Sequence, residues 1–97
     1  MVIDFTYFGT DYVLTVVHRD VYIDVKVSTG KGAKSKEKFY MLINKKVCTL
    51  EETYLGLLKD KFNIHGISLN DDEMKELFKG TFKPNRLEIK KRSFSLD

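Results

Sequence analysis

The side chains with the clearest chemical potential are the lysines of residues 29–38, which read Thr-Gly-Lys-Gly-Ala-Lys-Ser-Lys-Glu-Lys. Glu37 is the only acid in this stretch, and it contains no large apolar side chain to bury. Such a segment should be solvated and mobile, and solvated loops often carry binding functions. Because a lysine ammonium is a mobile point charge suited to phosphate, we expect this stretch to contact an anionic partner.

Further basic residues lie on both sides of this stretch and near the C-terminus. Lys26 precedes it, and Lys45 and Lys46 follow the next predicted strand. The second basic run has Glu88 as its only acid and comprises Lys83, Arg86, Lys90, Lys91 and Arg92. If the two runs converge in the fold, they form one basic face. If they lie apart, residues 29–38 are a solubilising hairpin end that discourages edge pairing.

Two tyrosines could add base stacking to these charges. Tyr22 and Tyr40 fall on the polar side of their predicted strands. Exposed aromatic rings beside lysines stack the bases of single-stranded nucleic acid, but tyrosines on neighbouring strands also pack simply as cross-strand pairs. Both interpretations stay open. The candidate binding residues are therefore Lys26, Lys31, Lys34, Lys36, Lys38, Tyr22, Tyr40, Lys90, Lys91 and Arg92.

The residues that could support catalysis or metal binding are few and scattered. His18, Cys48 and His65 are far apart in the sequence, and no histidine pair has the spacing of metal ligands. Residues 30–35 lack the spacing of a phosphate-binding loop, and a strand rather than a helix follows them. We therefore expect no catalytic residue, no metal and no cofactor, and we do not expect an enzyme.

Alternating apolar residues predict four strands in the first half of the chain, over residues 2–8, 12–18, 21–28 and 39–43. A period of two is typical of a strand that buries one face. The short, polar connections between the first three strands are typical of turns. The chain should therefore begin as a β-meander, with the lysine-rich stretch between its third and fourth strands.

Helical spacing of apolar residues predicts two helices in the second half. Thr49 and Glu52 have the form of a capping box for a first helix of about 13 residues, and Asn70 is a good N-cap for a short second helix. Leu87 and Ile89 alternate with charged residues and predict a last strand over residues 86–90. The order ββββααβ indicates an α+β fold, in which an antiparallel sheet of four to five strands carries two helices on one face.

Length and composition limit the class of protein. The 97 residues form one expected domain, residues 1–97, with residues 93–97 expected to fray. The hydrophobic fraction of 42% and the charged fraction of 32% exclude global disorder. A single cysteine, no recognisable signal peptide and no apolar run approaching about 18 residues predict a cytoplasmic protein without a membrane partner.

Two functional hypotheses follow. The first is a small non-enzymatic binding module whose basic sheet and hairpin face contacts DNA or RNA, or a protein bound to nucleic acid. Its sequence specificity should be low, because arginines that read bases are few. The alternative is a protein–protein inhibitor or adaptor, such as bacterial and phage accessory proteins, that binds a nucleic-acid-processing enzyme through a strand edge or its acidic helices. An exposed last strand could also pair with its own copy, so a homodimer stays open.

Overall fold

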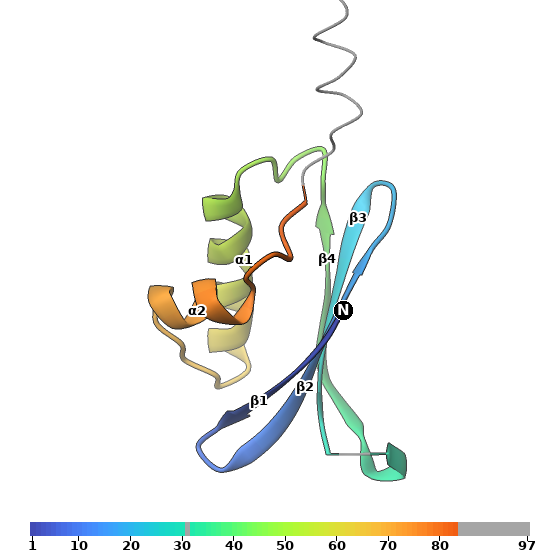
Figure 1. Ribbon diagram of the computed structural model, residues 1–97, viewed down its shortest axis with the longest axis vertical. Coiled ribbons are helices and arrows are strands. Elements are labelled where there is room, and N and C mark those ends of the chain that lie inside the picture. The colour runs from blue at the N-terminus through green and yellow to red at the C-terminus, as the bar shows by residue number, and fades with distance from the viewer. Residues whose placement is uncertain (31, 84–97) are drawn as a thin grey trace, which may run out of the picture.

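The computed structural model describes residues 1–30 and 32–83, which form an antiparallel sheet with two helices against one of its faces (Figure 1). The strands lie in the sheet in chain order, and a short 3₁₀ helix, η1, connects the third to the fourth. The α+β class and the succession of four strands and two helices are as predicted, whereas the last strand, expected over residues 86–90, lies outside the described residues. The elements are β1 (Val2–Tyr7), β2 (Thr10–His18), β3 (Tyr22–Thr29), η1 (Gly32–Lys34), β4 (Lys36–Asn44), α1 (Glu51–Ile64) and α2 (Asp71–Leu77).

A continuous apolar row crosses the four strands. Ile3 lies opposite Leu14, Leu14 opposite Val27, and Val27 opposite Phe39. Paired residues share a face of the sheet, so this row and its neighbours direct the buried side chains towards the helices. In the part of the chain that the structure describes, β1 and β4 form the two edges of the sheet.

Helix α1 covers the apolar face with a stripe of large side chains. Tyr54, Leu58 and Phe62 recur at four-residue intervals, and all three are fully buried. The ring centroid of Phe62 lies 5.2 Å from that of Phe39 on β4 and 6.1 Å from that of Phe5 on β1. Phe62 therefore contacts strands at both edges of the sheet.

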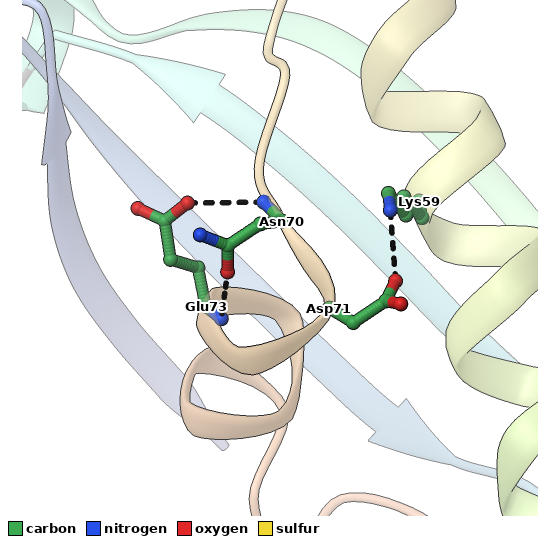
Figure 2. Close-up of polar contacts among 4 residues, drawn as sticks. All are labelled: Lys59, Asn70, Asp71 and Glu73. Carbon is green, nitrogen blue, oxygen red and sulfur yellow. Dashed lines mark hydrogen bonds and ion pairs between the residues drawn. The ribbon is translucent and has the colours of Figure 1, made fainter.

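Helix α2 begins with three polar contacts that Figure 2 shows. The Asn70 side chain accepts a hydrogen bond from the Glu73 amide at 2.8 Å, and the Glu73 carboxylate accepts one from the Asn70 amide at 3.0 Å. Lys59 of α1 donates to the Asp71 carboxylate at 2.8 Å, and this contact lowers the pKa of Asp71. The predicted Asn70 cap is confirmed, and the ion pair links the first turn of α2 to α1.

The capping box predicted at Thr49 is wrong. The first helical hydrogen bond of α1 runs from the Tyr54 amide to the Leu50 carbonyl, so the N-cap is Leu50, which has no side-chain cap. The chain is held just before this point, because the Cys48 amide donates to the Asn44 carbonyl at the end of β4. The helix therefore begins one residue later than the sequence suggested.

In the described part of the chain, the side chains of Tyr54 and Thr81 form two linked hydrogen bonds within the core. The Tyr54 hydroxyl lies 2.8 Å from the Thr81 hydroxyl, and both residues are fully buried. Because the Thr81 hydroxyl donates to the Phe78 carbonyl at 2.7 Å, Tyr54 must be the donor of this bond. The contact joins the middle of α1 to the segment after α2. Burial raises the pKa of Tyr54 to about 12.

We expect Tyr54 to make the protein less stable at alkaline pH. In the unfolded chain its phenol ionises near the ordinary pKa of 10.0, whereas in the folded chain it stays protonated up to about 12. The unfolded state therefore loses its proton first, and the free energy of unfolding should fall by about 1–3 kcal/mol as the pH rises through this range. Urea denaturation at a series of alkaline pH values measures this fall.

The matched control is Tyr54→Phe, which keeps the ring and removes the ionising hydroxyl. This variant should be less stable at neutral pH by about 1–2 kcal/mol, because the buried hydrogen bond is lost. Its further loss of stability at alkaline pH should be clearly smaller than that of the parent protein. An equal alkaline loss would assign the effect to other groups.

Candidate binding surfaces

The lysine-rich stretch is more regular than the sequence suggested. The ladder between β3 and β4 continues to the pair Thr29 and Lys36, so only residues 30–35 connect the strands. Gly30 has a φ of +81°, and a Cβ built on it would lie 2.6 Å from the Lys34 carbonyl oxygen. Only glycine fits this approach. The two strands thus extend into both ends of the lysine-rich stretch, and residues 32–38 are exposed to solvent as expected.

A β-bulge in β4 changes which face its charged residues occupy. The register shifts between Val27 and Ser28, so that Ser28 pairs with Glu37 and Lys38 has no cross-strand partner. The Lys38 ammonium lies 5.9 Å from the centroid of the Tyr12 ring, on the helical side of the sheet. Glu37 shares the opposite face with Ser28. Simple alternation along β4 predicts the reverse for both residues.

The predicted binding lysines therefore do not share one surface. Lys26 lies opposite Tyr40 on the face away from the helices, which we call the outer face. Lys36 pairs on the helical side, Lys38 lies over a core-side ring, and Lys34 is exposed in η1. The predicted residues outside the described part of the chain are Lys31, Lys90, Lys91 and Arg92.

Lys83, the one described member of the second basic run, lies at the other end of the sheet. Burial and then the charges of Lys45 and Lys83 lower the pKa of His18, the last residue of β2. The hairpin end that carries η1 joins the opposite ends of β3 and β4. Figure 1 shows this separation, with the orange segment after α2 running towards the β4–α1 connection and away from η1. The position of Lys83 therefore does not support the hypothesis that the lysine-rich stretch and the second basic run form one basic face.

The outer face exposes aromatic and aliphatic side chains. Val17, Tyr22, Tyr40 and Leu42 are between 41% and 51% exposed. Pairing brings these side chains together, because Val17 and Leu42 both lie opposite Asp24, the neighbour of Tyr22 on the same face of β3. Figure 1 shows both helices on the other side of the sheet. We define the outer patch as these four residues together with Arg19 and Lys26.

An ion pair lies at the centre of the outer patch. Asp24 is only 7% exposed, and the Arg19 guanidinium donates to its carboxylate at 2.6 Å. Lys45 holds the turn that carries Arg19 by donating to the Arg19 carbonyl at 2.6 Å. Partial burial and then the Asp24 charge raise the pKa of Tyr40. Asp24 is thus paired through Oδ2 and covered by its neighbours, while its buried Oδ1 has no hydrogen-bond partner in the described part of the chain. The tyrosine rings, the aliphatic side chains and the Arg19 side chain, which is 64% exposed, are the exposed groups around it.

Acids outnumber bases on the described outer face. Its cations are Lys26 and Arg19, and its acids are Asp4, Asp24 and Glu37, placed there by the strand register. Asp11 adds a fourth carboxylate at the start of β2, where it accepts a hydrogen bond from Thr6 at 2.9 Å. The surface that bears both candidate tyrosines therefore lacks an excess of positive charge.

The remaining chemically versatile residues have separate environments. His65 stacks on Phe39 at 4.7 Å between ring centroids, and Cys48 is buried, which raises the pKa of its thiol. Among residues 1–30 and 32–83, no group of three or more His, Cys, Asp or Glu side chains could hold a metal ion. No helix in the same residues is long and apolar enough to cross a membrane.

A cleft of about 530 Å³ separates α1 from α2 on the outside of the molecule. Leu55, Gly56 and Met74 line it, and the Lys59–Asp71 ion pair lies across it. Its charged groups are of both signs, and two of them already neutralise each other. The cleft offers no set of groups that would select one ligand.

Sequence reasoning missed three members of the outer patch, Val17, Arg19 and Leu42. The available signal was Asp24, an acid within the most strongly apolar strand, because a carboxylate in such a place needs a cation nearby. Lys26 is the nearest cation in the sequence, but the structure pairs Asp24 with Arg19, five residues away. Val17 and Leu42 gave no signal of exposure, since apolar residues on both faces of a strand usually indicate that both faces are covered.

We expect the Arg19–Asp24 pair to be needed for a stable outer patch. Arg19→Ala leaves a largely buried carboxylate without its cation. This lowers the free energy of unfolding more than replacing both members of the pair does. Thermal unfolding should therefore show a melting temperature lower by several degrees. Adding Asp24→Asn to the same chain should recover most of this loss.

The control for this prediction is Lys26→Ala, which removes a cation from the same face but breaks no ion pair with Asp24. Its melting temperature should stay close to that of the parent protein. If Arg19→Ala were as stable as Lys26→Ala, the buried carboxylate would not depend on Arg19.

Comparison of the chain with models of known protein families, with curated proteins and with solved structures finds no match. The function therefore has to be argued from the residues and geometry of this chain alone.

Proposed function

We propose that this protein is a non-enzymatic binding module, an adaptor or inhibitor that docks another protein through the outer patch. The observation that carries the proposal is the cluster of exposed Tyr22, Tyr40, Leu42 and Val17 around a neutralised ion pair. The solvated face of an antiparallel sheet is usually polar, so exposed apolar groups side by side suggest a contact surface. Tyrosine and arginine are also the residues most enriched where protein interfaces gain their binding energy.

The chemistry of the patch also indicates the kind of partner. A protein surface with aliphatic side chains could pack against Leu42 and Val17, while its hydrogen-bonding groups could meet the tyrosine hydroxyls and Arg19. The acids Asp4 and Glu37 lie towards the rim of the same face. A partner with a basic rim would therefore be favoured during encounter.

Single-stranded nucleic acid is the second candidate partner. Lys26 lies directly opposite Tyr40, which places a cation beside a ring that could stack a base. However, affinity for a phosphate backbone depends on cations that are not already neutralised. The acids on this face and the division of the hairpin lysines between two sides of the sheet favour the protein partner.

An affinity capture with matched variants tests the proposal. The tagged protein is exposed to a nuclease-treated lysate of the cells that produce it. The patch variant is Tyr40→Ala with Leu42→Asp, and the control is Lys34→Glu with Lys36→Glu at the hairpin end. Circular dichroism verifies that both variants are folded. We expect the parent and the control to retain one stoichiometric protein, and the patch variant to lose it by about tenfold or more.

Two results would contradict a protein partner at the outer patch. One is retention of the same protein by the patch variant. The other is capture that disappears with nuclease, combined with low-salt binding of labelled single-stranded DNA or RNA that Tyr40→Ala weakens. Fluorescence anisotropy measures this second result directly and would transfer the proposal to nucleic acid.

A further inference from the structure

A second exposed apolar surface lies on α1. Leu50, Leu57 and Ile64 are between 43% and 76% exposed, and they follow one another at intervals of seven residues. Seven residues make almost two helical turns, so Leu57 and Ile64 lie on one side of α1, and Leu50, the N-cap residue with an extended backbone, lies just before the helix at the same spacing. We call these three residues the heptad stripe. It lies apart from the buried stripe of Tyr54, Leu58 and Phe62.

The heptad stripe faces away from α2. Leu55 and Lys59 line the cleft between the helices, and at 3.6 residues per turn Leu57 points about 160–200° away from them. The loop before α2 is tied to β1, because the Ser68 amide donates to the Tyr7 hydroxyl at 3.1 Å. In Figure 1, α2 and β1 lie nearer the viewer than α1 and β4. The stripe is therefore on the β4 side of α1.

The heptad stripe lies beside the edge strand β4 along the length of both elements. Helix α1 runs antiparallel to β4, since its start follows Asn44 closely while His65 at its end stacks on Phe39. Phe62 contacts Phe39, and Leu57 lies about 7.5 Å back along the helix at 1.5 Å per residue. At roughly 3.3 Å per residue, the corresponding position on β4 is Met41.

We propose that a second copy of this chain occupies this surface, with the two β4 strands paired antiparallel across a two-fold axis. Positions 50 and 64 are equally distant from 57. An axis through Leu57 therefore sets it against itself and sets Leu50 against Ile64 of the second copy. The same axis passes Met41 and places Phe39 opposite Ile43 of the second copy. This self-complementarity is what a two-fold interface requires.

The charges along this surface fit a second copy. An axis at Met41 pairs the uncharged run of residues 39–43 with itself. On α1, the charged residues beside the stripe are Asp60 and Lys61; the axis brings Lys61 to Thr53 of the second copy, whereas Tyr54, at the position related to Asp60, is buried in its own core. No like charges of these segments meet across the axis.

The consequence is one sheet that continues through both copies. Tyr40 and Leu42 lie on the outer face, and the axis at Met41 places each of them opposite the other from the second copy. The two outer patches would thus adjoin each other across the axis. The pairing also satisfies the backbone edge of β4, which exposed strands otherwise offer to unrelated chains. This inference stands without the proposed function.

Light scattering and site-directed crosslinking of the full chain test the proposal. At micromolar concentrations the parent protein should have twice the mass of one chain, and Leu57→Glu should have the mass of one. Asn63→Glu, at an exposed position on another side of α1, should remain dimeric. A short bismaleimide should link two Leu57→Cys chains and should link Asn63→Cys chains several-fold less. Cys48 is buried and is the same in both variants.

Three results would overturn the proposal. The first is a parent protein with the mass of one chain throughout the concentration range. The second is a dimer that Leu57→Glu leaves intact. The third is a crosslink within one chain between Leu57→Cys and Leu87→Cys, which would assign the surface to residues 84–97 of the same chain.

Discussion

The packing of Phe62 against both edges of the sheet is the contact on which the rest of the arrangement depends. Its ring meets Phe39 on β4 and Phe5 on β1, and Phe78 after α2 meets it at 5.6 Å between centroids. Two edge strands and both helices thus share one aromatic side chain. Since aromatic rings bury large areas and prefer defined geometries, this contact fixes α1 over the sheet and leaves α2 to close the core beside it.

That arrangement also decides which surfaces remain exposed. Both helices pack on the same face, so the outer patch has no cover from the described residues, and its central acid, Asp24, needs Arg19. The heptad stripe is exposed for a related reason, because α2 occupies only one side of α1. The two apolar surfaces are therefore consequences of where the described part of the chain places its two α-helices.

Much of the fold could be predicted from local patterns. Alternation in β2 and β3 and the Asn70 cap of α2 are short-range effects, and all of them hold in the structure. Prediction failed where a distant contact set the outcome. Helix α1 has Leu50 rather than Thr49 as its N-cap, after a segment in which the Cys48 amide is hydrogen-bonded to the end of β4, and the bulge at Lys38 depends on pairing with β3. For the candidate site, Tyr22, Tyr40 and Lys26 were predicted correctly to be exposed, but their surroundings were not.

By itself, the sequence determined the α+β class, the succession of the elements and the concentration of lysines between the third and fourth strands, because periodicity and composition are properties of neighbouring residues. Only the tertiary structure decided how those lysines are distributed. One extra residue in β4 turns Lys38 to the helical side and Glu37 to the outer face. A register shift of this kind reverses the face of each side chain beyond it, and pairing with another strand, rather than the local sequence, selects the register.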